Sequence, residues 1–340
     1  MTTHYRLFCI VLLILAALAV FAGRPAGREV DVDNPDSFPM PTLGGKQFWA
    51  DELFFHQCRI QRNVLSGHCR LLDERNWRQA SGTFDHCRAV LERIKRDRGL
   101  PPMTGKAVVV LHGLGRSRSS MSALCKHLQE KGGYRVFNVG YPSTQYDMAE
   151  QARTLRRLVD NLDGIEEINF VGHSMGNIVV RHYLGDLAEA EKSGFSAADR
   201  RAVARFGRFV MLAPPNQGSR LASVFANNAL FKQIVGEAGQ QLGRQWPELE
   251  KHLATPHFQF GVVAGGKGDG KGYNPLLSGD NDGVISVETA KLAGARDFIV
   301  VPSLHSFVMD KVQVQRYVLS FLQHGYFVSD PKRQPLEKQP

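Results

Sequence analysis

Residues 168–180 have the sequence INFVGHSMGNIVV. They run from a short apolar segment with strand character, through a tight Gly-x-Ser-x-Gly turn, into an apolar periodic segment that predicts a helix beginning near Met175. Gly172 and Gly176 suit such a turn, because strand and helix pack too closely there for a Cβ. A serine on this turn projects its hydroxyl above the sheet edge, beside the free N–H groups of the helix N-terminus. The alternative is an ordinary surface serine between two turn glycines, so Ser174 is a candidate nucleophile only if partners for it exist elsewhere.

Length and composition set the class of protein. The chain has 340 residues, 43% of them hydrophobic, which predicts one large globular α/β domain with appendages. The formal net charge of +9 is compatible with an anionic partner. The excess charge is not concentrated in one long basic run, and no aromatic-basic binding motif accompanies it, so we expect no nucleic-acid partner.

The N-terminal segment 1–23 predicts targeting or anchoring. An apolar run of 16 residues, 7–22, follows Arg6 and precedes Arg24. This length is long for a signal-peptide core and slightly short for a membrane span of about 20 residues. Cleavage after Ala22 is one alternative. We favour an uncleaved signal-anchor, a transmembrane helix that associates the protein with a membrane and leaves the catalytic domain outside the cytoplasm.

Residues outside the main domain are expected to form three further segments. Residues 24–45 are rich in Pro, Gly and Asp and predict a linker. Residues 46–100 carry apolar side chains at helical intervals between many arginines, and predict a helical N-terminal extension packed on the main domain, with a partner-docking or membrane-surface hairpin as the alternative. Residues 329–340 predict a disordered tail.

Four cysteines follow the apolar run, an even number that allows one or two disulfides in an exported chain: Cys58, Cys69, Cys87 and Cys125. No Cys-x-x-Cys pair occurs, and the two histidines that precede cysteines, His68 and His86, lack ligand spacing. We therefore expect no metal site.

The main domain, residues 101–328, alternates strands with helical segments. This order predicts a mainly parallel sheet with helices on both faces, whose ligand crevice lies beyond the carboxyl ends of the strands. The expected strands, besides the one before Ser174, are 107–111, 134–141, 209–212, 260–264 and 298–301, with a helix at 149–161.

Partners for Ser174 occur on two strand-end loops downstream. A serine hydroxyl needs an imidazole base, and that base needs a carboxylate to set its tautomer. Asp282 lies in the polar turn GDNDGVI, and His305 follows the strand at 298–301. Asp280 is the alternative carboxylate, and His324, far into the last helix, is a weaker alternative base.

These motifs together resemble those of an α/β-hydrolase, specifically the lipase/esterase group and the bacterial lipases within it. The matching residues are His112 to Gly115, Gly172 to Gly176, Asn281 to Val284, and His305, over about 106–325 of the chain. The resemblance implies the α/β-hydrolase fold and the order Ser, Asp, His. It also implies that Ser174 is the nucleophile, Asp282 the orienting carboxylate and His305 the general base, and that the backbone N–H groups of Leu114 and Met175 form the oxyanion hole.

Three further features near these motifs have predicted roles. His112 and His173 each precede a motif glycine and are expected to shape the turns rather than to act as bases. Asn177 stands where the family often has glycine. The surplus of chain within 187–258 contains an amphipathic stretch that fits either a cap over an acyl pocket or a permanently packed helix.

The sequence therefore predicts a serine hydrolase that cleaves carboxylic esters, of the lipase or esterase type, on lipid-like or aliphatic substrates through an acyl-enzyme. No cofactor is expected for this mechanism. The alternatives are an acyltransferase or thioesterase on the same fold, and a non-catalytic membrane-associated binding protein that has kept the fold.

Overall fold

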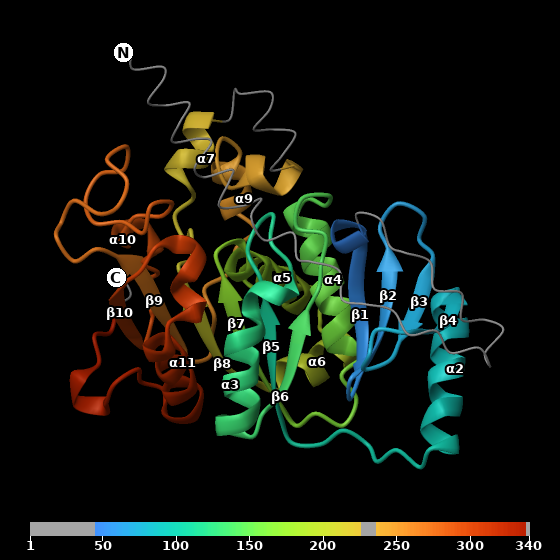
Figure 1. Ribbon diagram of the computed structural model, residues 1–340. Coiled ribbons are helices and arrows are strands. Elements are labelled where there is room, and N and C mark those ends of the chain that lie inside the picture. The colour runs from blue at the N-terminus through green and yellow to red at the C-terminus, as the bar shows by residue number, and fades with distance from the viewer. Residues whose placement is uncertain (1–44, 226–235, 338–340) are drawn as a thin grey trace.

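A six-stranded parallel sheet forms the centre of the molecule (Figure 1). The computed structural model describes residues 45–225 and 236–337. The strand order is β10-β9-β8-β7-β5-β6, and every neighbouring pair is parallel. The strands are β5 (Lys106–Leu111), β6 (Arg135–Val139), β7 (Glu167–His173), β8 (Phe206–Leu212), β9 (Phe260–Gly266) and β10 (Asp297–Pro302). The predicted fold class, a mainly parallel sheet with helices around it, is confirmed.

Both faces of this sheet are buried, which explains why its strands are continuous apolar runs. Successive side chains of a strand point to opposite faces. In β5, Val109 joins the larger hydrophobic cluster on one face, whereas Val108 and Val110 join the smaller cluster on the other. The same alternation places Phe170 and Val171 of β7 in different clusters.

Helices cover each face of the sheet. α3 (Ser122–Gly132) and α11 (Val312–His324) contribute to the smaller cluster, and α4 (Met148–Asp160) and α5 (Met175–Lys192) to the larger one. Further α-helices among the described residues of the main domain are α6 (Ala197–Val203), α7 (Arg220–Phe225), α9 (Trp246–Glu250) and α10 (Val287–Ala290). Figure 1 shows α7 and α9 beyond the strand ends at the top of the view.

The prediction that residues 46–100 are helical is wrong over most of this range. These residues form a four-stranded antiparallel sheet followed by a single helix. The elements are β1 (Trp49–Phe55), β2 (Cys58–Asn63), β3 (Cys69–Leu72), β4 (Arg78–Gly82) and α2 (Phe84–Asp97), after a 3-10 helix η1 (Gly45–Phe48). Only α2 agrees with the helical prediction. Its N-cap, Thr83, accepts a hydrogen bond from the His86 backbone N–H.

The error has a physical cause in β1. All residues of β1 except the first are buried, so it shows none of the alternation that reveals a half-exposed strand. The apolar residues of β1 and of the neighbouring strands happen to recur at intervals that resemble those of a helix. Tight turns separate the strands, with positive φ at His56 (50°), Gly67 (71°) and Asn76 (65°).

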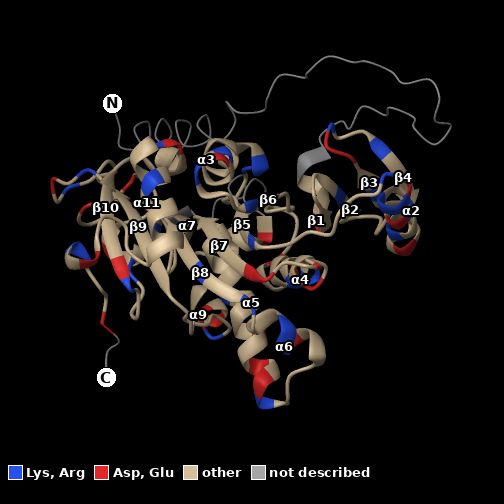
Figure 2. Cartoon of the chain, turned by 90° about the horizontal axis from the view of Figure 1, so that it is seen from below, with Lys and Arg blue, Asp and Glu red and all other residues tan. Residues whose placement is uncertain are grey.

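The four-stranded sheet is tied to the main domain through buried acidic groups. Glu52 of β1 is 1% exposed and forms ion pairs of 2.8 Å with both Arg62 of β2 and Arg157 of α4. Figure 2 shows this sheet and α2 at one end of the molecule, beside α4 and β6. The extension therefore packs on the main domain as predicted, although its secondary structure differs.

Residues 329–337 of the C-terminal tail are ordered, contrary to the prediction of disorder for this segment. After a 3-10 helix η4 (Asp330–Lys332), Leu336 exchanges backbone hydrogen bonds with Gly294 (2.7 Å) and Ala295 (2.9 Å). The Gln334 N–H also donates to the carboxylate of Asp297 (2.9 Å). Backbone pairing that composition does not reveal holds this polar segment in place.

Several predictions fall partly or wholly outside the described residues. The apolar run 7–22, the linker 24–45 except Gly45, and residues 226–235 of the predicted cap region lie outside them. Elsewhere in the cap region, Ala238, Leu242, Trp246 and Leu249 are buried in the larger cluster. Among the helices of 45–225 and 236–337, none has the length and apolar character needed to cross a membrane. The four described cysteines are free thiols, so they do not form the disulfides that their number would allow.

Candidate active site

Ser174 occupies a strained turn between β7 and α5. Its backbone has φ 53° and ψ −123°, which non-glycine residues rarely adopt. A Cβ on Gly176 would lie 2.8 Å from the carbonyl oxygens of Leu111 and His112, and one on Gly172 would lie 2.8 Å from the Asn177 nitrogen. The two glycines therefore allow the close packing that the turn requires.

Asn177 braces this turn from within the core. Its side chain is fully buried and donates hydrogen bonds to the carbonyl oxygens of Ser174 (2.9 Å) and Leu212 (3.1 Å). The Ser174 N–H donates to the same Leu212 oxygen at 2.9 Å. The departure from glycine at Asn177 thus supplies a polar brace between β8 and the serine turn.

The structure brings Ser174, His305 and Asp282 together. His305 Nε2 lies 2.9 Å from Ser174 Oγ, and His305 Nδ1 lies 2.7 Å from Asp282 Oδ2. An ionised carboxylate can only accept, so Nδ1 carries the proton and Nε2 is left to accept from the serine hydroxyl. Three side chains from separate loops therefore form one continuous hydrogen-bonded chain.

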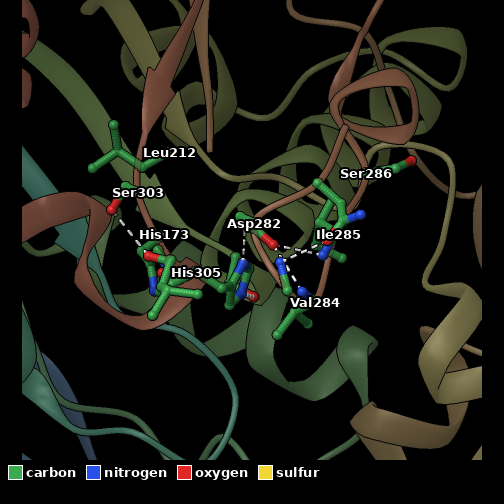
Figure 3. Close-up of polar contacts among 12 residues, drawn as sticks. His173, Leu212, Asp282, Val284, Ile285, Ser286, Ser303 and His305 are labelled. Atoms are coloured by element: carbon green, nitrogen blue, oxygen red, sulfur yellow. Dashed lines mark hydrogen bonds and ion pairs between the residues drawn. The ribbon is translucent and has the colours of Figure 1, made fainter. Parts of the chain in front are cut away.

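Asp282 is held rigidly on the far side of His305. Figure 3 shows the carboxylate between His305 and the backbone of the following turn. Oδ1 accepts from the N–H groups of Val284 (2.9 Å) and Ile285 (2.7 Å), and the side chain is 1% exposed. The Asp282 carbonyl also accepts from the His305 N–H at 2.9 Å. Each carboxylate oxygen consequently has its own partners, which fixes the orientation of the imidazole.

The alternative residues contact other parts of the molecule. Asp280 accepts hydrogen bonds from the N–H groups of Lys267 (2.7 Å) and Gly268 (2.9 Å), so it stabilises the glycine-rich loop after β9. His324 ends α11, where its ring stacks on Tyr326. Neither one contributes to the chain of hydrogen bonds through His305.

His112 and His173 are buried imidazoles that support the surrounding backbone. His173 Nε2 donates to the His305 carbonyl at 3.0 Å, and burial beside His305 lowers the pKa of His173 well below its usual range. His112 Nδ1 donates to the Gly113 carbonyl at 2.9 Å, and burial lowers the pKa of His112 to about 4. Both rings are therefore neutral at pH 7, and each fixes the backbone of a loop beside Ser174.

The loop that follows β5 passes directly over Ser174. A Cβ on Gly113 would lie 3.0 Å from His173 Nδ1 and 3.1 Å from the Ser174 Cβ, closer than side chains normally pack, so glycine suits this approach. Met175 is the first residue of α5, where an N–H has no partner inside the helix. Within 45–225 and 236–337, the N–H groups of Leu114 and Met175 donate to no other group. Two free amide donors thus lie on the residues that were predicted to form an oxyanion hole.

Exposed apolar side chains lie beside the loops that carry Asp282 and His305. Leu304 is 45% exposed and Phe307 41%, one residue before and two residues after His305, and Tyr273 is 39% exposed. A Cβ on Gly283 would be within 4 Å of both Leu304 and Tyr273, which shows that the two side chains are neighbours. A cleft of about 280 Å³ lies elsewhere, lined by residues of β1, α2 and the segments 100–103 and 161–164, and none of these three residues lines it. This exposed apolar surface lies beside the loops that carry Asp282 and His305.

Two residues that the sequence did not single out hold the loop above Ser174. Tyr141 donates a hydrogen bond from its hydroxyl to the His112 carbonyl, and the Gly115 N–H donates to Ser143 Oγ at 3.1 Å. Neither residue belongs to a motif, and no local signal marks it. Among the described residues, no three His, Cys, Asp or Glu side chains gather as a metal site requires.

Comparisons with known proteins identify the family. Residues 108–310 match a model described as the alpha/beta hydrolase family. Among solved structures, the chain is similar to mature lipase BlEst2 from Bacillus licheniformis (19% identity, 60% of this chain and 86% of that chain, TM-score 0.43). It is also similar to the lin2722 gene product from Listeria innocua (15% identity, 66% and 96%, TM-score 0.46) and to the metagenomic carboxyl esterase MGS0156 (18% identity, 61% and 68%, TM-score 0.40).

No curated protein matches the chain. The TM-scores just given all lie below 0.5, so the assignment rests on the family model, which covers more than half of the 340 residues. This chain belongs to the alpha/beta hydrolase family.

Proposed function

We propose that this protein is a serine hydrolase that cleaves carboxylic esters through an acyl-enzyme. The observation that carries the proposal is the hydrogen-bonded chain from Ser174 Oγ through His305 to Asp282, with distances of 2.9 Å and 2.7 Å. A serine hydroxyl becomes an effective nucleophile at neutral pH when an imidazole in this position accepts its proton.

In the first half of the reaction, Ser174 Oγ attacks the ester carbonyl carbon while its proton moves to His305 Nε2. The resulting imidazolium is stabilised by Asp282, which stays ionised. His305 then donates that proton to the leaving alkoxide as the C–O bond breaks, and the acyl group remains on Ser174. Water attacks this acyl-enzyme by the same steps with the roles repeated, and releases the carboxylic acid.

Two backbone amides would stabilise the tetrahedral intermediate. The free N–H groups of Leu114 and Met175 belong to the two segments that flank Ser174. Donors of this kind act most strongly where charge develops during the reaction. Each typically contributes about 3 kcal/mol to transition-state stabilisation.

The proposed substrates are lipid-like or aliphatic acyl esters. Support comes from the exposed apolar side chains of Leu304, Phe307 and Tyr273 beside the loops of His305 and Asp282. Burying such a surface against an acyl chain is favourable by roughly 25 cal/mol per Å² of apolar area. A chain-length series of chromogenic esters tests this point, since activity should rise beyond acetate.

Ser174→Ala tests the central proposal. The variant should lose roughly 10⁴- to 10⁶-fold in kcat and should no longer be labelled by a fluorophosphonate. Its thermal midpoint should stay close to that of the wild type, because alanine has the same backbone preference at φ 53° as serine. Hydrolysis near the wild-type rate in Ser174→Ala would remove Ser174 from its role. A wild-type protein inert to short and long esters, without labelling, would instead favour a non-catalytic binding function.

A further inference from the structure

Gln47 connects the N-terminal extension to the loop above Ser174. It lies in η1, directly before β1, and its side chain contacts two loops of the main domain. We infer that Gln47 is a positioning residue that holds the oxyanion donor at Leu114 in place. The inference rests on the proposed function, because it assigns a purpose to the loop that carries this donor.

The contacts of Gln47 form a clamp on residues 115 and 116. Gln47 Nε2 donates to the Arg116 carbonyl at 2.8 Å. Gln47 Oε1 accepts from Ser143 Oγ at 3.3 Å, and Ser143 Oγ in turn accepts from the Gly115 N–H at 3.1 Å. Gln47 therefore holds the backbone on both sides of the peptide bond between Gly115 and Arg116, directly at the Arg116 carbonyl and through Ser143 at the Gly115 N–H, just after Leu114.

The orientation of the Gln47 amide is determined by its backbone partners. The Thr144 N–H, which can only donate, lies 3.3 Å from Oε1, and the Arg116 carbonyl, which can only accept, lies 2.8 Å from Nε2. A flipped amide would place donor against donor and acceptor against acceptor. The clamp therefore requires both ends of a glutamine side chain, and neither glutamate nor alanine can replace it.

The loop between β6 and α4 also contacts the beginning of the segment 112–116, which carries the Leu114 donor. Tyr141 donates its hydroxyl to the His112 carbonyl. Asp51 of β1, fully buried, holds Gly140 through two bonds, from its own N–H to the Gly140 carbonyl (2.9 Å) and from the Gly140 N–H to Oδ2 (2.6 Å). The N-terminal extension thus holds the loop between β6 and α4 in place. That loop in turn holds the segment after β5 at His112 and at Gly115.

Two roles for Gln47 predict different kinetics: it either positions the Leu114 N–H donor or only links the N-terminal extension to the main domain. If Gln47 acts through the oxyanion donor, its loss weakens the interaction with the developing negative charge and leaves ground-state binding intact. If it only ties two segments together, its loss lowers stability and leaves the reaction of the folded protein unchanged. The effect on kcat separates the two.

The test compares Gln47→Glu and Gln47→Ala with Gln79→Ala in the full-length protein. Gln79 is a matched control in the same extension, half-buried and bonded to Asp73 at 2.9 Å, without contact to either loop. Both Gln47 variants should lower kcat for a chromogenic ester about tenfold, a fraction of the loss expected on removing a donor outright. KM should change by less than about twofold, and Gln79→Ala should match the wild type. Gln47→Glu keeps the shape of the side chain, which guards against misfolding of the alanine variant.

A thionoester comparison reports on the oxyanion hole itself. Sulfur in place of the carbonyl oxygen accepts hydrogen bonds poorly, so the preference for the oxygen ester measures how well the donors are placed. This preference should fall about tenfold in the Gln47 variants. A preference equal to that of Gln79→Ala, with kcat unchanged, overturns the inference while the proposed function stands.

Amide hydrogen exchange tests the clamp without using activity. Exchange across residues 112–118 should be faster in Gln47→Glu than in the wild type, and unchanged in Gln79→Ala. Equal exchange in all three proteins overturns the clamp. If the wild type hydrolyses no ester, the proposed function fails, and slow exchange lost only in the Gln47 variants still establishes that Gln47 positions this loop.

Discussion

Replacing Asp282 with asparagine should disable His305 without unfolding the protein. In the native site, Asp282 Oδ1 accepts from the N–H groups of Val284 (2.9 Å) and Ile285 (2.7 Å), and Oδ2 accepts from His305 Nδ1 (2.7 Å). Asparagine has only one acceptor end. If its NH₂ group faced the two backbone donors, two buried repulsive contacts would form, so the opposite orientation is favoured.

That orientation reverses the proton on the imidazole. The asparagine NH₂ then donates to His305 Nδ1, which must become the acceptor, and the proton moves to Nε2. His305 can no longer accept the proton of Ser174 Oγ from 2.9 Å away. The residues are nearly fully buried, 1% exposed for Asp282 and 8% for His305, so water cannot substitute for the carboxylate. We expect kcat to fall by about 10⁴-fold, which corresponds to about 5.5 kcal/mol of barrier.

The assay measures kcat and KM for a short-chain chromogenic ester in Asp282→Asn, with Asp280→Asn as the control. Asp280 accepts from Lys267 and Gly268 N–H groups at 2.7 Å and 2.9 Å, in the same polar turn but away from His305. Asp280→Asn should lower the thermal midpoint and leave kcat within a few-fold of the wild type. A rate for Asp282→Asn within tenfold of the wild type, or an equal loss in Asp280→Asn, would refute the reasoning.

Two further predictions concern stability. Burial lowers the pKa of His112 from 6.5 to about 4, so the unfolded chain binds more protons between these values, and the free energy of unfolding should fall by about 3 kcal/mol as the pH drops from 7 to 4. Urea titrations at several pH values measure this fall. If His112→Gln lost as much unfolding free energy between pH 7 and 4 as the wild type, the prediction would be contradicted. Glu52→Gln should lower the free energy of unfolding by roughly 3 kcal/mol, because Arg62 and Arg157 then lose their shared carboxylate. Urea unfolding at pH 7 measures this loss, with Glu189→Gln, which breaks an exposed ion pair with Lys192, as the control. A loss no larger than in the control would show that the Glu52 ion pairs do not hold the four-stranded sheet to α4.

The main sheet could be predicted from the sequence because its signals are local. Each parallel strand is a short apolar run, and β5, β6, β9 and β10 fall within about two residues of the predicted limits. The expectation that Ser174, Asp282 and His305 meet came from the rule that loops at the carboxyl ends of parallel strands meet at one edge, and the choice of Asp282 over Asp280 came from the resemblance to the family. Their contact distances could not follow, because these depend on how the loops fold.

What the sequence did not reveal depends on contacts between distant segments. β1 is buried on both sides, so its residues carry no periodic signal that distinguishes a strand from a helix. The tail at 333–337 is polar, yet it pairs with the backbone at 294–295. Gln47, Tyr141 and Ser143 act through one or two hydrogen bonds to main-chain atoms, and such bonds leave no pattern along the chain.

The backbone at Ser174 also has a bearing on whether this protein has retained chemistry. A side chain at φ 53° and ψ −123° strains the fold by about 1–3 kcal/mol, and glycine would relieve most of that strain. If the hydroxyl served no reaction, glycine would be the more stable choice at this position. A catalytic serine accounts for this strained backbone, because the turn exposes its hydroxyl. In a protein that only binds, the same strain would lower stability without contributing to function.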